Sequence, residues 1–238
     1  MLFITDDVKI NRQDIHIAVI PDGNRRWSRK RGKPEWYGHY CGAKKMEDFL
    51  DWVLEHTEIK MISIYGLSTE NLNRSEKELK KLWEIYRKEF KKILTSKKIR
   101  ENNIKVNIVG EENFWSPNFK HLAKSVMKST ENYTKSVLNI LIAYGAQSEI
   151  LSTVKKIVKT GVKAIPPLRD AFVDYLMVNR PVDLVIRTGG QYRLSNFLLY
   201  QTAYAELYFS DTLWPDFSRK EFEKILKWFW DQKRKFGK

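Results

Sequence analysis

The sequence predicts an α/β protein, a single domain with a mostly parallel six-stranded sheet flanked by helices. Short apolar runs alternate with longer amphipathic stretches, as strands and helices do along a parallel sheet. No internal repeat, low-complexity tract or linker divides the 238 residues, of which 42% are apolar, enough for one sizeable core. Residues 1–238 are therefore expected to form one domain.

Six short runs rich in Ile, Val, Leu and Tyr have the composition of strands buried on both faces. They are Ile15–Ile20, Met61–Leu67, Ile104–Val109, Val137–Ala143, Asp183–Arg187 and Ala205–Ser210. Two of the helices between and after them begin with a capping box, at Ser75 with Glu78 and at Ser218 with Glu221. Because such sheets bind ligands near the carboxyl ends of their strands, we expect the functional residues just after these runs.

The charge of the chain favours an anionic partner. Lysine and arginine together number 43 against 29 acidic residues, which gives a formal net charge of +14. Nucleic acid, an acidic membrane surface and phosphorylated substrates all fit such a surplus, and charge alone does not choose among them.

The cellular location is predicted from the cysteine content and the apolar runs. Cys41 is the single cysteine, which excludes a disulfide within the chain and is typical of a reducing cytosol. The first ten residues lack the apolar core of a secretory leader, and no apolar run approaches the roughly 20 residues of a membrane helix. We expect a cytoplasmic protein, with peripheral contact at a membrane surface left open.

The segment after the first strand, Pro21–Trp27, has the parts of a diphosphate site. Gly23 permits a tight turn and a close approach of the backbone to a ligand, and Arg25 and Arg26 can bind phosphate oxygens at a helix start. Asp22 would repel a diphosphate unless a hard cation such as Mg²⁺ lay between them. A helix cap with surface arginines is the alternative, and this segment alone leaves both open.

Polar residues also crowd the ends of two other strands. After the second strand come Ser68, Thr69, Glu70, Asn71 and Arg74, for which turn and capping chemistry is the alternative.

After the fifth strand, Arg187 and Arg193 flank a glycine pair and Ser195 follows, which predicts a second anion pocket. Glu206 lies in an apolar stretch, where a carboxylate is usually paired or bound to metal.

In this order, the segments resemble the cis-prenyltransferase family, which includes undecaprenyl and dehydrodolichyl diphosphate synthases. The motifs that carry the resemblance are Asp22–Trp27, Gly38-His39, Ser68–Asn71, Asp183–Gly190, Arg193–Phe197 and Ala203–Phe209. The doubled arginine most resembles archaeal and eukaryotic members. The resemblance implies the fold of that family, which is not a Rossmann fold, and a homodimer.

The resemblance also implies Mg²⁺-dependent condensation of isopentenyl diphosphate with an allylic diphosphate, farnesyl or geranylgeranyl, with each new double bond cis. The implied product is a long-chain, undecaprenyl-like polycis-polyprenyl diphosphate, a precursor of a glycosyl carrier lipid. A basic nucleic-acid-binding protein and a catalytically silent partner subunit remain as alternatives. Against the first, no helix-turn-helix, RRM or KH signature is present, and we expect no nucleic-acid partner.

Matching the motifs residue by residue assigns expected roles. Asp22 would be the magnesium-linked acid that helps expel the allylic diphosphate, and Asn71 the proton acceptor. Glu206 would complete the metal environment. The allylic diphosphate would be held by Gly23, Asn24, Arg25 and Arg26, with His39 assisting. Isopentenyl diphosphate would be held by Arg187, Arg193 and Ser195, with Arg74 helping to bind substrate. Further substrate-site positions are Trp27, Ser68, Thr69, Glu70 and Leu194.

Some positions depart from the family pattern. They are Glu35, Leu72, Gln147, Gln191, Tyr192 and Lys235. None is Asp22, Asn71 or a binding arginine, so we expect an active enzyme.

The residues of the second and fourth strands predict a tunnel for the prenyl tail. Alternation places Ile62, Ile64 and Gly66 on one face. By resemblance, Gly66 lies on the tunnel wall and Ser136 near its floor. Both residues are small, which predicts a deep tunnel and a long product.

Overall fold

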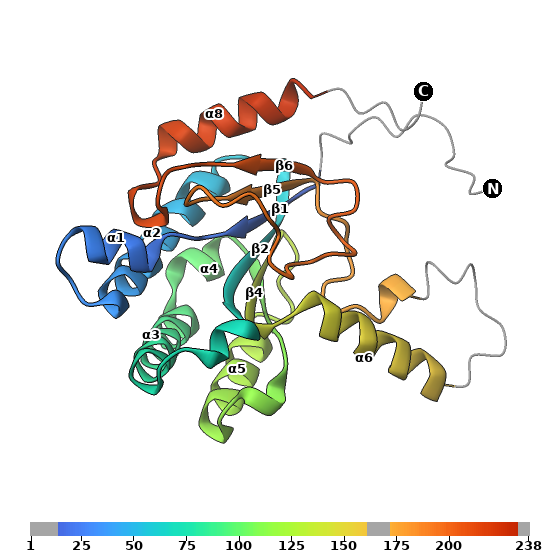
Figure 1. The fold of residues 1–238 in the computed structure, drawn as a ribbon. Coiled ribbons are helices and arrows are strands. Elements are labelled where there is room, and N and C mark those ends of the chain that lie inside the picture. Colours follow the sequence, from blue (N-terminus) through green and yellow to red (C-terminus); the bar gives the residue numbers. More distant parts are fainter. Residues whose placement is uncertain (1–13, 161–171, 233–238) are drawn as a thin grey trace.

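The computed structural model describes residues 14–160 and 172–232 and has a six-stranded sheet at its centre (Figure 1). The strands lie in the order β3-β4-β2-β1-β5-β6, and all neighbours are parallel. Their bounds are β1 Ile15–Ile20, β2 Ile59–Ser68, β3 Ile104–Val109, β4 Ser136–Tyr144, β5 Leu184–Arg187 and β6 Glu206–Phe209. The predicted sheet is confirmed, with every strand boundary within two residues of the sequence prediction.

Helices connect these strands and pack on both sides of the sheet. They are α1 Asn24–Lys30, α2 Glu35–Leu54, α3 Glu76–Thr95, α4 Lys97–Glu101, α5 Pro117–Ser129, α6 Ala146–Lys159 and α8 Arg219–Trp230. Short 3-10 helices span Glu70–Asn73, Glu112–Phe114 and Trp214–Asp216. None of the helices in the described segments has the length and apolarity that a membrane crossing requires.

The two predicted capping boxes form only on the serine side. Ser75 accepts a hydrogen bond from the Glu78 N–H and Ser218 from the Glu221 N–H, so both helix starts are confirmed. The glutamate side chains bond elsewhere, however: Glu221 accepts from Ser210, and Glu78 contacts cationic side chains in the candidate site. A glutamate at this position can therefore carry a second role.

The two faces of the sheet carry separate apolar cores. Side chains from α2, α3, α4, α5 and α8 cover one face, where Phe49, Phe90, Phe119 and Phe222 are buried. The start of α6 and the segment around Phe197 cover the other face. Helix α6 projects away from α2 and α3 (Figure 1). β1 lies between β2 and β5. The chain segments that follow β1 and its neighbours therefore cross opposite faces of the sheet, and a ligand crevice typically forms at the carboxyl ends of the strands at such a point.

A line of polar side chains, buried except for the half-buried Asn107, crosses four strands. Asn107 donates to Asn139 (2.9 Å), and Asn139 donates to the Ser63 hydroxyl (3.0 Å). His16 lies 2.8 Å from the same hydroxyl through Nε2 and 2.9 Å from the Pro181 carbonyl through Nδ1. A register slip of one residue would leave these buried groups unpaired, so the line fixes the strand register.

Candidate active site

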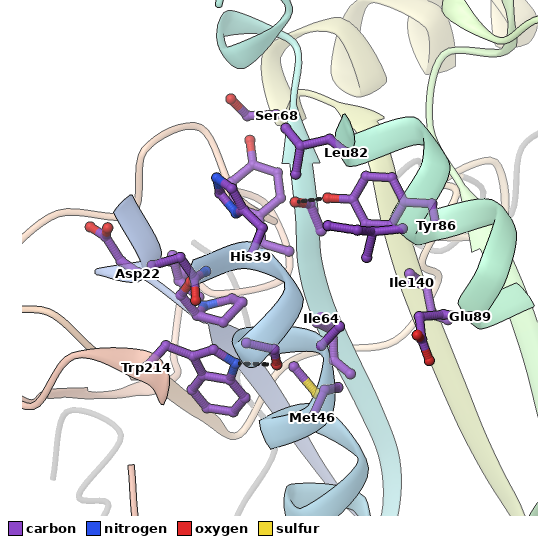
Figure 2. A pocket seen from close by; sticks show the side chains of 18 of the residues that line it. Asp22, His39, Met46, Ile64, Ser68, Leu82, Tyr86, Glu89, Ile140 and Trp214 are labelled. Atoms are coloured by element: carbon purple, nitrogen blue, oxygen red, sulfur yellow. Dashed lines mark hydrogen bonds between the residues drawn. The ribbon is translucent and has the colours of Figure 1, made fainter. Parts of the chain in front are cut away.

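One cavity of about 1050 Å³ connects the polar strand ends with the apolar space between α2 and α3. Figure 2 shows Asp22 and His39 on one side of it and Ile64, Ile140 and Glu89 on the other. The apolar part is lined by Met46, Leu50, Ile64, Leu82, Ile85, Tyr86, Phe90, Ile93, Leu138 and Ile140. A polar head and an apolar tail of one ligand therefore fit in one continuous space.

Most of the residues singled out in the sequence line this cavity. They are Asp22, Gly23, Asn24, Arg25, Arg26, His39, Ser68, Glu70, Asn71, Arg74, Arg187, Arg193 and Ser195. They come from segments far apart in the chain, and the parallel sheet brings them together at its carboxyl edge.

Asp22 is held at the centre of the polar end. Its carboxylate lies 3.0 Å from Arg187 Nη2 and 3.2 Å from Arg26 Nη2, and it accepts a 2.6 Å hydrogen bond from the Gly23 N–H. Its backbone carbonyl accepts from the Thr188 hydroxyl (2.9 Å) and the Trp214 N–H (3.0 Å). The side chain is 31% exposed, so the carboxylate is fixed in place and still reaches the cavity.

Two glycines allow this arrangement. Gly23 has φ 108° and Gly189 has φ 87°, values that residues with a Cβ rarely adopt. A Cβ on Gly23 would lie 2.8 Å from the Leu213 side chain, and one on Gly189 would lie 2.7 Å from Arg26 Nη2. Gly23, for which a close backbone approach was predicted, and Gly189 thus make room for Asp22 and its arginine partner.

Arg187 is a buried cation, 4% exposed, that links Asp22 to the loop of Arg193 and Ser195. Nη2 bonds Asp22, while Nη1 donates to the Ser195 hydroxyl (2.8 Å) and to the Arg193 carbonyl. Its Nε is buried without a hydrogen-bond partner in the described part of the chain. Ser195 and Asn196 have φ 52° and 62°, so this loop is held in a rare conformation beside the cavity.

A second charged group lies between α2 and α3. The Glu78 carboxylate is 3.1 Å from Arg74, 3.3 Å from His39 and 3.6 Å from Arg25. Glu35, one of the departures from the family pattern, is 2.6 Å from Arg25. Glu35 also lies 3.3 Å from Arg29, which lines the cavity.

The protonation of this group follows from its surroundings. Burial lowers the pKa of His39 below its usual value, so the imidazole is neutral near pH 7. The hydrogen bond from His39, followed by the charges of Arg74 and Arg25, lowers the pKa of Glu78 and keeps it ionised. Sequence reasoning missed Glu78 and Arg29; the signal for Glu78 was the capping pattern, which points only to the backbone.

Four of the expected site residues do not line the cavity. The Trp27 indole N–H donates to Asp216 (2.7 Å), and Arg31 stacks on its ring. Leu194 packs against the core of the opposite face, and Thr69 lies beside Gly145.

Glu206, expected in the metal environment, is the fourth expected site residue that does not line the cavity. It pairs with Leu184 at the amino end of β6, whereas Asp22 follows the carboxyl end of β1, so a single chain does not bring the two together.

The other departures occupy varied positions. Gln147 lines the cavity, Leu72 packs against the main core, and Gln191 donates to its neighbour's carbonyl, Gly190. Tyr192 is exposed and donates to Asp211. Lys235 lies outside the described residues.

Gly66, expected on the wall of a tunnel for the prenyl tail, lines the cavity. Gly66 interrupts the pairing of β2 with β4, and its carbonyl accepts a 2.6 Å hydrogen bond from the Tyr86 hydroxyl. A Cβ on Gly66 would lie 2.6 Å from Ile142 Cδ1 and 3.1 Å from the Leu141 carbonyl. Ser136, expected near the floor, is not among the residues that line the cavity; Leu138 and Ile140 of the same strand are.

The wall that carries His39 is built by close helix packing. Gly38 and Gly42, one turn apart on α2, lie against Asn24 of α1: a Cβ at Gly38 would be 1.9 Å from the Asn24 carbonyl. The Trp214 indole also donates to the Gly42 carbonyl (2.9 Å; Figure 2). Larger residues at Gly38 or Gly42 would push α1 away from α2, and Arg25 would then lie farther from His39.

The residues present fit a magnesium ion bound together with substrate. Within the described segments, no three Asp, Glu, His or Cys side chains gather to form a metal cage. Mg²⁺ is usually bound by one or two carboxylates together with substrate phosphates and water. Asp22, accessible from the cavity and paired with the guanidinium groups of Arg26 and Arg187, is a donor of that kind.

Comparisons with known proteins agree with this geometry. The family model Prenyltransf, which describes undecaprenyl diphosphate synthase, matches residues 20–237. A geranylgeranyl-diphosphate-specific tritrans,polycis-undecaprenyl-diphosphate synthase from Pyrococcus abyssi is 39% identical over 99% of this chain and 91% of its own length. A farnesyl-diphosphate-specific ditrans,polycis-undecaprenyl-diphosphate synthase from Buchnera aphidicola is also 39% identical, over 94% of this chain and 90% of its own.

Solved structures give the same result. Lavandulyl diphosphate synthase from Lavandula x intermedia, in complex with dimethylallyl diphosphate, superposes with a TM-score of 0.86 at 27% identity. A probable undecaprenyl diphosphate synthase from Campylobacter jejuni gives 0.79 at 30% identity. Each match covers 95% of this chain and 99% of the other. The chain therefore belongs to the cis-prenyltransferase family, whose members carry out cis-prenyl chain elongation.

Proposed function

We propose that this protein condenses isopentenyl diphosphate repeatedly with geranylgeranyl or farnesyl diphosphate to give an undecaprenyl-like polycis-polyprenyl diphosphate. The observation that carries the proposal is one continuous cavity, in which the Asp22–Arg187 cluster opens into an apolar space between α2 and α3. The names of the relatives from Pyrococcus abyssi and Buchnera aphidicola support both starters. Such a product is a precursor of a glycosyl carrier lipid.

The proposed reaction breaks the bond between the allylic carbon and its diphosphate, forms a carbon–carbon bond to isopentenyl diphosphate and releases one proton. Arg25 and Arg26, with the backbone at Gly23, hold the allylic diphosphate, and Arg187, Arg193 and Ser195 hold the other substrate. Asp22 would hold Mg²⁺, which when bound neutralises the charge of the departing diphosphate.

Asn71 is the proposed proton acceptor. Its backbone N–H donates to the Ser68 hydroxyl (3.2 Å), which fixes the residue at the cavity. Two anion pockets joined by Arg187 hold both substrates within reach of each other, and this supplies much of the rate enhancement.

We propose a homodimer as the assembled state. Exposed apolar side chains lie on α6 and along the segment that leads into β6, where the sheet has an open edge. They are Leu151, Val154, Val158, Tyr192, Tyr200, Tyr204 and Leu207. Sedimentation equilibrium of the purified protein tests this proposal, and a monomer at micromolar concentration would contradict it.

We also propose peripheral contact with an anionic membrane through α2 and α3. Lys44 and Lys88 lie 5.0 and 5.6 Å from the Tyr40 ring centre, and Lys81 lies 5.9 Å from that of Trp36. Aromatic rings beside lysines are typical of protein surfaces at the lipid–water interface. Sedimentation with phosphatidylglycerol vesicles, and none with phosphatidylcholine vesicles, is the expected result; equal binding to both or to neither would contradict it.

The activity itself is tested with purified protein, Mg²⁺, labelled isopentenyl diphosphate and each starter. Long-chain labelled product, lost when EDTA removes the metal, is expected. Failure to incorporate label with either starter would contradict the proposal, and salt-dependent retention on DNA would then favour the nucleic-acid alternative.

A further inference from the structure

The far end of the cavity, away from Asp22, is lined by charged side chains. Glu47 of α2 and Glu89 and Lys92 of α3 line it, together with Lys98 of α4. Charged groups are unexpected at the end of a space for a hydrocarbon tail, since such a tail gives them no partner. No role in diphosphate chemistry accounts for them, because the diphosphate-binding arginines lie at the opposite end.

These side chains pair with one another across the gap between the helices. Lys92 Nζ lies 2.7 Å from Glu47 Oε1 and 2.8 Å from Glu89 Oε2. Lys98 Nζ lies 2.5 Å from Asp51 Oδ1 and 3.5 Å from the Glu47 carbonyl. Lys92 thus links α3 to α2 by an ion pair, at the point where the contacts between the two helices change from apolar to charged.

This end of the cavity reaches solvent. Lys92 is 47% exposed and Glu47 is 50% exposed, although both line the cavity. Glu89 is less exposed, and Figure 2 places it near Ile140 on the inner side of α3. Burial raises the pKa of Glu89, as expected for a carboxylate beside an apolar space. The Lys92 ion pairs therefore lie between the apolar space and solvent.

The size of the cavity makes this boundary important. A cavity of roughly 150 Å³ holds one six-carbon benzene molecule, so about 1050 Å³ holds on the order of 40 carbons. The diphosphate groups of both substrates occupy part of that space. An undecaprenyl chain, which has eleven five-carbon units, exceeds what remains, so its tail must leave before elongation is complete.

We propose that Lys92, with Glu47 and Glu89, is an ion-pair latch over the outlet of the tunnel. The tail of the growing prenyl chain parts α2 from α3 here when it outgrows the cavity, and the strength of the latch sets the product length. Ion pairs at this exposure contribute little to stability, so they can separate without unfolding either helix. The inference deepens the proposed chain elongation and rests on it.

The test is the product length of charge variants. Lys92→Glu places three carboxylates together and opens the latch, so products should lengthen by at least one isoprene unit while the first condensation keeps its rate. The double variant Glu47→Lys/Lys92→Glu restores an opposite-charge pair and should return the wild-type distribution. That rescue separates the ion pair from a mere change in side-chain size.

Arg219→Glu is the matched control. Arg219 also lies between two carboxylates, Glu55 just after the end of α2 and Glu223 on α8, is 52% exposed and does not line the cavity. The products of Arg219→Glu should have the same lengths as those of the wild type. Unchanged or shorter products from Lys92→Glu, a double variant that fails to revert, or lengthening by Arg219→Glu would each overturn the latch. Absence of any prenyl product from the wild type would instead overturn the proposed function.

Discussion

Acid should destabilise this protein through one buried histidine, His16 of β1. The ring is fully buried, with Nδ1 against the Pro181 carbonyl and Nε2 against the Ser63 hydroxyl. Ser63 already accepts a hydrogen bond from Asn139, so its hydrogen is directed to Nε2. The neutral ring satisfies both contacts, whereas a protonated ring would direct a second donor at that hydroxyl.

Burial is the main cause that lowers the pKa of His16 from 6.5 to about 4, and the charge of Arg180 adds to it. Between these two values the unfolded chain binds a proton that the folded chain does not. The stabilisation is therefore fully present above pH 6.5 and is lost as the pH falls towards 4. At about 1.36 kcal/mol per pH unit, folding loses about 2 kcal/mol by about pH 5.

Urea unfolding of the wild type and of His16→Asn at about pH 7 and about pH 5 measures this loss. The other titrating groups, His39 included, are common to both proteins and cancel in the comparison. The free energy of unfolding of the wild type should fall by about 2 kcal/mol more than that of the variant. An equal fall in both proteins, or an NMR titration of His16 with its midpoint near pH 6.5, would refute the reasoning.

Further predictions concern the cavity. Asp22→Asn should nearly abolish turnover and leave the circular dichroism spectrum unchanged. Asparagine is preferred to alanine because its amide oxygen leaves Arg187 a hydrogen-bond partner. A near wild-type rate in the folded variant would contradict the role of the carboxylate. Arg193→Ala should raise the KM for isopentenyl diphosphate roughly 10- to 150-fold, more than the KM for the allylic substrate, as expected for a lost charge-assisted contact; a rise for the allylic substrate alone would show that the pockets are assigned in reverse. Gly66→Leu and Ile140→Phe should both give shorter products, as measured by chromatography. Only Gly66→Leu should also have a lower melting temperature, because its Cβ meets Ile142. Unchanged product lengths in both variants would show that the tail runs elsewhere.

Local patterns predicted the strands and most of the polar cavity, because both depend on residues close together in sequence. Alternation and composition located β1 and β3 to the residue, and the strand ends located Asp22 and Arg187. Interactions between distant segments were not predictable in this way. Glu78 has the pattern of a helix cap, and only the packing of α3 against α2 reveals its cationic partners.

The charges at the far end of the cavity illustrate the same limit. Lys92 lies among many lysines on α3, and nothing in its neighbourhood in the sequence distinguishes it from a solvated side chain. Its function depends on Glu47, 45 positions away. Glu206 shows the converse: its sequence motif predicts a metal role, while the path of β6 places it at the other end of the strand.

The glycine contacts between α1 and α2 have a consequence for a processive enzyme. Such an enzyme must perform the same chemical step on a ligand that grows at every cycle. Here the wall with His39 and the arginines of α1 is closely packed at Gly38 and Gly42, with no side chain of α2 between the two helices at these positions. The opposite wall, α3, meets it through side chains that can rearrange. We therefore expect the growing chain to displace α3 rather than the wall that carries His39, so that the polar end keeps its geometry from cycle to cycle.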